Sequence, residues 1–220
     1  MEIAVSAAVY LVLAGTVLAL RGRPSYPAAK AAAGLAFIVL AVLCALEGNI
    51  TPGVRTFTAG FVLCAAGDVA LGVYNLSRRT AWMAGGIGVF FCGHLCFLGG
   101  LWKLHTAAPA WLLLPAVSAG VLVVLLRRGV VNMGRLAPFG VCYCFAVSTL
   151  LAQSLSVAFA LATPAAVLLC AGAALFWTSD FILLFLYFGR QGRSAGLHIA
   201  NLVTYYGGIL LLALSLCGLF

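Results

Sequence analysis

The sequence contains eight apolar runs, and each is about as long as a helix needs to cross a bilayer, about 20 residues. They lie near residues 3–20, 29–47, 57–75, 81–101, 109–126, 136–157, 163–187 and 196–218. Short segments such as Arg21-Gly22-Arg23-Pro24, Thr51-Pro52-Gly53 and Thr163-Pro164 separate them. The chain is therefore predicted to be an all-α polytopic membrane protein with eight transmembrane helices. We expect a single integral membrane domain over residues 1–220, because the loops leave no room for a soluble one.

Charge and cysteine content agree with this interpretation. Only 7% of the residues are charged, whereas a soluble domain carries roughly a quarter. The net charge of +8 does not indicate nucleic-acid binding, since the basic residues form short clusters between the apolar runs. All eight cysteines lie inside the runs and none forms a CxxC pair, so we expect packed thiols and no disulfide framework. The first run lacks a basic n-region and is expected to be a retained helix, not a signal peptide.

The basic residues predict the orientation of the helices. Ten of the twelve are assigned to odd-numbered loops and only Arg55 and Lys103 to even-numbered ones. The ten are Arg21, Arg23, Lys30, Arg78, Arg79, Arg127, Arg128, Arg135, Arg190 and Arg193. Because loops rich in Lys and Arg stay in the cytoplasm, the odd loops are predicted to be cytoplasmic. Both termini are then predicted to lie on the opposite side.

Two of the four acidic residues lie where an acid is costly. Glu2 is near the start of the first run and Glu47 near the end of the second, where an interfacial position is expected. Asp68 and Asp180 lie well inside their runs, and an acid at mid-membrane costs at least about 2.5 kcal/mol. Such a residue indicates a functional site. The alternative is a structural hydrogen bond between helices, made by a protonated carboxyl.

The two aspartates are predicted to lie at the same depth. Asp68 precedes Arg78 by ten residues, and Asp180 precedes Arg190 by ten. At 1.5 Å per residue, each carboxyl lies about 15 Å from a basic loop on the same side. If their helices are neighbours, the two groups face each other. One is then expected to act as an acid and the other as a base.

Other polar side chains within the runs are candidates to bind a substrate. His94 shares a helical face with Phe90 and Phe97, and Asn201 shares one with His198 and Tyr205. The candidates are Lys30, His94, Tyr143, Asn201, Tyr205 and Tyr206. Lys30 is interpreted either as a partner for a lipid phosphate or as a loop charge that sets topology. The histidine and tyrosines have an alternative role as ordinary hydrogen-bonding groups of the core.

A weak internal similarity appears at an offset of 112 residues. It relates Gly67-Asp68-Val69-Ala70-Leu71 to Ser179-Asp180-Phe181-Ile182-Leu183, and His94 to Tyr206. Two four-helix halves in the same orientation would produce it. The sequence has no Walker loop, GxSxG, HExxH or cluster of soft metal ligands. We therefore predict no metal site and no cofactor.

In order along the chain, these residues resemble the YhhN/TMEM86 family of lysoplasmalogenase-like membrane proteins. The matching pieces are Lys30, Gly67-Asp68-Val69-Ala70-Leu71, Phe91-Cys92-Gly93-His94-Leu95-Cys96-Phe97, Tyr143, Phe176-Trp177-Thr178-Ser179-Asp180 and Thr204-Tyr205-Tyr206. Two departures occur. The family ending Tyr-Tyr-x-Ala-Gln reads Tyr205-Tyr206-Gly207-Gly208-Ile209, and the Tyr after the His motif is Phe97.

The resemblance implies hydrolysis of the vinyl ether bond of lysoplasmalogens, which releases a fatty aldehyde and a glycerophospho-headgroup. The substrate would be a lysophospholipid, and Asp68 and Asp180 would be the catalytic acid and base. A proton on the vinyl carbon and water on the resulting oxocarbenium ion are what two carboxyls can supply. Two other classes stay open: a proton-coupled transporter or lipid translocator that uses the same Asp and His residues, and a non-enzymatic lipid-binding protein. The sequence indicates no oligomeric state.

Overall fold

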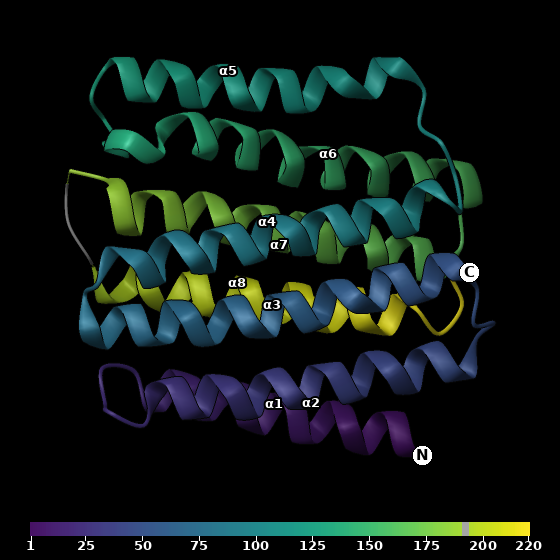
Figure 1. Ribbon diagram of the computed structural model, residues 1–220. Coiled ribbons are helices and arrows are strands. Elements are labelled where there is room, and N and C mark those ends of the chain that lie inside the picture. Colours follow the sequence, from purple (N-terminus) through teal and green to yellow (C-terminus); the bar gives the residue numbers. More distant parts are fainter. Residues whose placement is uncertain (191–193) are drawn as a thin grey trace. The chain divides into compact units, whose positions relative to one another are not determined.

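A computed structural model describes residues 1–190 and 194–220, and these residues are almost entirely helical (Figure 1). The helices are α1 (Glu2–Ala19), α2 (Tyr26–Glu47), α3 (Pro52–Ser77), α4 (Thr80–Trp102), α5 (Leu113–Arg127), α6 (Ala137–Leu161), α7 (Pro164–Phe188) and α8 (Ala195–Ser215). Short 3-10 turns precede α5 and α6, at Pro109–Leu112 and Gly134–Leu136. The described residues form no strand, only one isolated bridge between Val131 and Gly189. The all-α prediction is confirmed.

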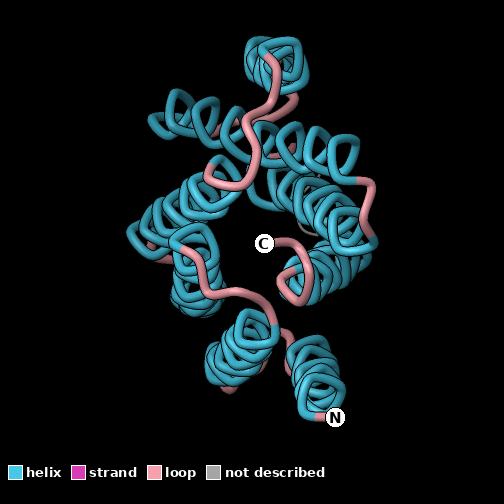
Figure 2. Tube along the Cα trace, turned by 90° about the vertical axis from the view of Figure 1, so that its right-hand side faces the viewer, coloured by secondary structure: helices cyan, strands magenta, loops and turns pink. Residues whose placement is uncertain are grey.

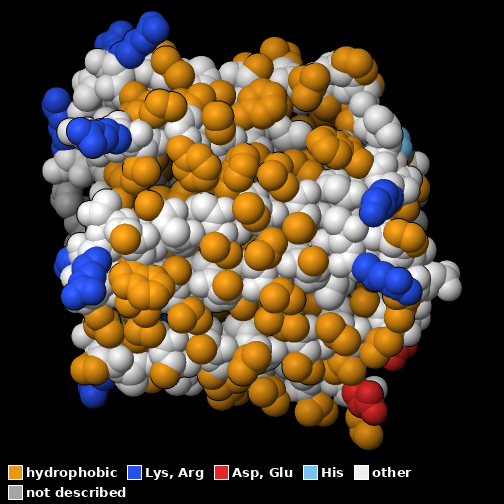
Figure 3. Space-filling view, in the orientation of Figure 1, with side chains coloured by type: hydrophobic (Ala, Val, Ile, Leu, Met, Phe, Trp, Pro, Cys, Tyr) orange, Lys and Arg blue, Asp and Glu red, His pale blue; other side chains and the backbone are white. Residues whose placement is uncertain are grey.

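Eight of the described segments are long and apolar enough to cross a membrane, the fifth and sixth together with their 3-10 turns, as Pro109–Arg127 and Gly134–Leu161. The length of α4 can be compared with the thickness of a membrane, because tryptophan prefers the membrane interface and Trp82 and Trp102 are both exposed. They lie twenty residues apart, or about 30 Å along a helix, which is the thickness of the hydrocarbon core. Apolar side chains cover the visible sides of the helices, whereas Lys and Arg gather at their ends (Figure 3).

Several helices begin earlier than the apolar runs predict. The third run was predicted to start at residue 57, but α3 starts at Pro52. The Thr51 side chain accepts a hydrogen bond from the Val54 amide at 3.2 Å and caps the helix. Thr163 caps α7 in the same way through the Ala166 amide. Proline is tolerated in a first turn, so Thr-Pro marks a helix start here, not a loop.

The described residues separate into two compact units. The first comprises residues 1–104 and 213–220, and the second residues 105–212. In the first unit α1 packs on α2, α2 on α3 and α3 on α4; in the second α5 packs on α6 and α6 on α7. Short loops join successive helices (Figure 2). The boundary after residue 104 lies between the fourth and fifth spans. Two four-helix halves would meet at the same place in the sequence. The two-repeat interpretation and the single domain stay predictions.

Glycines bring α3 and α4 into close contact. A Cβ on Gly60 would lie 2.5 Å from the Phe97 ring, and one on Gly67 would lie 2.7 Å from the Phe90 ring. On α4, a Cβ on Gly100 would lie 2.9 Å from the Gly53 carbonyl. Each position therefore admits only hydrogen, as the small residues along α3 predict. The neighbouring Asp68 is buried as well, and its side chain lies against α2.

One basic residue does not belong to a loop. Lys30 lies in the second turn of α2 and is only 5% exposed, so its assignment as a loop charge is wrong. Arg193 lies outside the described residues. Without Lys30, nine basic residues still flank the odd loops, against Arg55 and Lys103 at the other end. The asymmetry that orients the chain therefore persists.

We expect residue 220 to be on the non-cytoplasmic side of the membrane, because of this asymmetry. A reporter that works only outside the cytoplasm should be active when it is fused after Phe220, and one that works only in the cytoplasm should be inactive there. A second fusion within the Arg127–Arg135 loop should give the opposite result. A cytoplasmic signal from residue 220 would refute the orientation.

Candidate functional site

Asp68 lies in the middle of the first unit and is 1% exposed. Its Oδ1 is 2.6 Å from the Nζ of Lys30 on the neighbouring helix α2, which makes a buried ion pair. Burying either charge alone would be very costly, whereas the pair is neutral as a whole. The aspartate is therefore held as a carboxylate inside the bilayer, and the Lys30 ammonium is engaged by it.

Local features of α2 and α3 make this pairing possible. A Cβ on Gly72 would lie 3.3 Å from the Lys30 Cδ and 3.2 Å from the Pro27 Cα. Glycine at this position therefore lets the start of α2 lie against α3, with the lysine stem between them. The Tyr26 ring lies one turn earlier on α2, with its centroid 5.6 Å from Lys30 Nζ, so it adds a cation–π contact.

A tyrosine from α1 adds to the same environment. Tyr10 is fully buried, although most of α1 is exposed, and its ring packs edge-on against Phe37 at 6.2 Å. Tyr10 also lies within electrostatic range of Asp68. The ion pair is thus surrounded by aromatic side chains from α1 and α2. Tyr10 and Tyr26 were not identified from the sequence. Tyr10 could have been found from its spacing, because Tyr10, Ala14 and Val17 recur at helical intervals and form the buried face of α1.

His94 is completely buried in α4 of the first unit. Its Nδ1 lies 2.7 Å from the Phe90 carbonyl oxygen, which can only accept, so Nδ1 carries the hydrogen. The imidazole meets the Phe97 ring edge-on at 6.5 Å. The shared face with Phe90 and Phe97 is confirmed. A role for His94 in substrate binding stays a prediction.

Asp180 lies on α7 of the second unit and is partly exposed. The Tyr143 hydroxyl on α6 donates a hydrogen bond to its Oδ2 at 2.9 Å. The two carboxyls thus differ in their environment, because Asp68 is matched by a cation and Asp180 by a neutral phenol. A carboxyl that faces a phenol can exist in either protonation state, whereas one that faces an ammonium is held ionised.

The two units position their carboxyls in the same way. In each, the partner comes from the preceding helix, 38 residues earlier for Asp68 and 37 residues earlier for Asp180. This is the arrangement expected of related halves. The prediction that Asp68 and Asp180 face each other stays a prediction, since they lie in different units.

The residue beside Asp180 is fixed by α8. The Asn201 side-chain amide donates to the Ser179 carbonyl at 2.8 Å and to the Ser179 Oγ at 2.9 Å, and Ser179 Oγ donates back to the Asn201 carbonyl at 3.2 Å. Close by, a Cβ on Gly172 would lie 3.0 Å from the Gly208 carbonyl oxygen, so the two backbones touch. Asn201 therefore holds α8 against α7 next to the carboxyl. Its predicted contact with substrate stays a prediction.

Tyr205 and Tyr206 are both buried on α8. Their ring centroids are 5.0 Å apart, and Tyr205 also packs edge-on against Phe176 of α7 at 5.3 Å. Their inward position agrees with the sequence, which placed them away from the membrane interface. Their role in binding substrate stays a prediction. Within the described part of the chain, no three His, Cys, Asp or Glu side chains are grouped as a metal site would require.

A comparison with protein families gives one match, to the model described as the YhhN family, over residues 25–216. The matched region runs from the start of α2 to the end of α8 and includes both aspartates and their partners. Helix α1, with Tyr10, precedes it. Comparisons with curated proteins and with solved structures gave no match.

Proposed function

Because the chain belongs to the YhhN family, we propose that it is an intramembrane hydrolase that cleaves the vinyl ether bond of lysoplasmalogens. The observation that carries the proposal is the pair of aspartates inside apolar helices, one matched by Lys30 and the other by Tyr143. A vinyl ether has no acyl carbonyl, so its hydrolysis needs neither a serine nucleophile nor an oxyanion hole. It needs an acid, a base and a water molecule.

The two environments suit these two roles. In the proposed mechanism Asp180, in its protonated form, delivers a proton to the vinyl carbon, which leaves an oxocarbenium ion. The Asp68 carboxylate, kept ionised by Lys30, accepts a proton as water attacks this ion. The resulting hemiacetal breaks into a fatty aldehyde and the glycerol hydroxyl of the headgroup. As the hemiacetal breaks, the Asp180 carboxylate takes the proton of its hydroxyl and Asp68 gives its proton to the leaving glycerol oxygen. One water is consumed, and both carboxyls return to their starting forms.

The buried Lys30–Asp68 pair also supports the assignment of the catalytic base to Asp68, in the first unit. The ammonium keeps Asp68 in the ionised form that a base needs before the reaction. In this proposal Lys30 is a positioning residue for Asp68, and its predicted contact with the lipid headgroup stays a prediction. Tyr143 has the corresponding role for Asp180, because its hydroxyl fixes one carboxyl oxygen.

Incubation of the purified protein with a panel of lysolipids tests the function. We expect aldehyde release from 1-alkenyl lysolipids and none from 1-acyl or 1-alkyl lysolipids of equal chain length, since only the alkenyl ether can be protonated at carbon. Aldehyde is measured by trapping with a hydrazine and mass spectrometry. No aldehyde, with lipid or proton flux in proteoliposomes, would instead support a transporter.

A second expected result concerns the number of chains. We expect one-chain alkenyl lipids to be cleaved at least about tenfold faster than two-chain plasmalogens, because helices that are joined by short loops leave little room for a second chain. Both lipids are presented at the same mole fraction in the same detergent, and initial rates are compared. Equal rates would refute the preference for one chain.

A further inference from the structure

Residues 213–220 lie against the end of α2 in the first unit. A Cβ on Gly48, the residue that ends α2, would lie 3.1 Å from the Leu216 carbonyl oxygen. Leu216 is buried, and its amide and that of Cys217 form turns by donating to the Ala213 and Leu214 carbonyls. The backbone after α8 is thus folded directly onto the last turn of α2.

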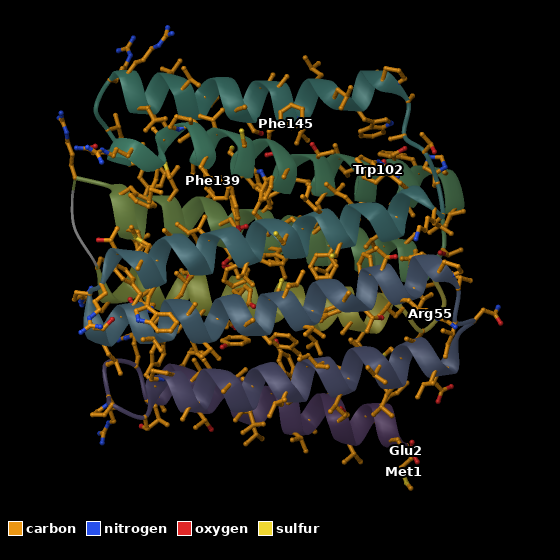
Figure 4. The ribbon with its side chains drawn as sticks, viewed as in Figure 1. Met1, Glu2, Arg55, Trp102, Phe139 and Phe145 are labelled. Atoms are coloured by element: carbon orange, nitrogen blue, oxygen red, sulfur yellow. The ribbon has the colours of Figure 1, made fainter. Side chains whose placement is uncertain are left out.

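The segment is also anchored beyond these turns. The Phe220 ring lies 6.1 Å from the Phe57 ring of α3, and a Cβ on Gly53 would lie 3.0 Å from it. Residue 217 is therefore placed between two fixed contacts, one at Leu216 and one at Phe220. The end of the unit with these contacts also carries Arg55 and Trp102 (Figure 4).

Two thiols meet in this contact. Cys44 lies one helical turn before Gly48 and is fully buried, whereas Cys217 is exposed. The Cys217 thiol is near enough to interact with the Cys44 thiol. Because the backbones at Gly48 and Leu216 already touch, little movement is needed to bring the two sulfur atoms into bonding distance. The other cysteines of this unit, among them the exposed Cys92, serve as a comparison.

We propose that Cys44 and Cys217 form a disulfide that fastens residues 213–220 to the end of α2. The oxidant is a small-molecule or protein disulfide. One thiolate attacks it and forms a mixed disulfide, and the second thiolate displaces the bound half. One Sγ–Sγ bond forms, both thiols lose their hydrogens, and the oxidant leaves as two thiols. This does not depend on the proposed hydrolysis.

The position of the pair favours its oxidation. It lies at the end of the first unit opposite to Arg21, Arg23, Arg78 and Arg79. By the orientation proposed above, this end faces the non-cytoplasmic side of the membrane. Disulfides form and persist on that side. Of the two cysteines only Cys217 is exposed, so its thiolate attacks the oxidising disulfide first, and the buried Cys44 thiolate completes the exchange.

The test uses purified protein in detergent, so that it does not depend on the compartment. The protein is treated with oxidised glutathione, remaining thiols are alkylated, and the protein is digested and analysed by mass spectrometry. We expect one linked pair of peptides, containing Cys44 and Cys217, that dithiothreitol separates. Oxidation should also raise the thermal midpoint by about 5 °C. The Cys92→Ser variant should behave like the wild type, and Cys44→Ser and Cys217→Ser should lose both effects.

Two results would overturn the proposal. In the first, Cys44 and Cys217 are both alkylated after oxidation of protein that is still folded. In the second, the linked peptides contain other cysteines, and the Cys217→Ser variant keeps the rise in thermal midpoint. Each serine variant is compared with its own reduced form, so a general loss of stability does not affect the result.

Discussion

Replacement of Asp180 by Asn is expected to lower aldehyde release by a factor of at least about a hundred, the usual scale for losing a general acid. The amide cannot deliver the proton, but it keeps the shape of the side chain. Its carbonyl oxygen can still accept the hydrogen bond that Tyr143 now donates to Oδ2. The amide is neutral, like the protonated carboxyl that it replaces, so the substitution buries no new charge. The folded yield and the thermal midpoint should therefore stay close to those of the wild type.

Tyr143→Phe is the matched control for Asp180→Asn. It removes the hydroxyl but leaves the carboxyl, so we expect a loss of about tenfold, the equivalent of one hydrogen bond worth about 1.4 kcal/mol. Rates are expressed per folded molecule, with the folded fraction taken from gel filtration. An Asp180→Asn protein with lost expression and an unchanged rate per folded molecule would show a structural role and contradict the acid assignment.

The helices and the buried face of α3 could be predicted from the sequence because both depend on local patterns. A membrane helix needs only a long apolar run, so the existence of each helix could be predicted, although several begin before their runs do. The small residues Gly60 and Gly67 recur with the helical period, and the structure places the Phe97 and Phe90 rings on them. The sequence placed Asp68 near this stripe, but its side chain pairs with Lys30 of α2, so the way in which it is buried does not follow from the pattern.

The ion pair could not be predicted because it depends on how α2 is placed against α3. Lys30 is close to two arginines in sequence, so it resembles a topology-setting charge. Whether it lies in the loop or in the helix depends on where α2 begins, and Pro27 was taken as part of the loop, although it lies in the first turn. Tyr10 was missed because an aromatic residue in an apolar run is usually a packing residue, and Tyr26 because it lies before the predicted start of the second run.

The ion pair changes what is expected of Asp68. Asp68→Asn would leave the Lys30 ammonium in the bilayer without its carboxylate, and breaking a buried pair costs about 3–5 kcal/mol. We therefore expect this variant to lose stability as well as activity, unlike Asp180→Asn. Lys30→Met should lose a similar amount of stability, because Asp68 is then the group without a counter-charge. The free energy of unfolding is measured by denaturation in mixed micelles.

The double variant Lys30→Met/Asp68→Asn separates the structural contribution of the pair from its catalytic one. With both charges removed, no uncompensated charge is buried, so stability should return to within about 1 kcal/mol of the wild type. Activity should stay at least about a hundredfold lower, because the base is still missing. Lys103→Met is the control, since Lys103 is exposed and donates to Thr56 at 3.0 Å, and its effect on stability should be within about 0.5 kcal/mol.

Two outcomes would contradict these expectations. If the stability losses of the two single variants add in the double variant, Lys30 and Asp68 are not coupled in the way that their 2.6 Å separation indicates. If activity returns together with stability, Asp68 acts only through the fold and is not the base.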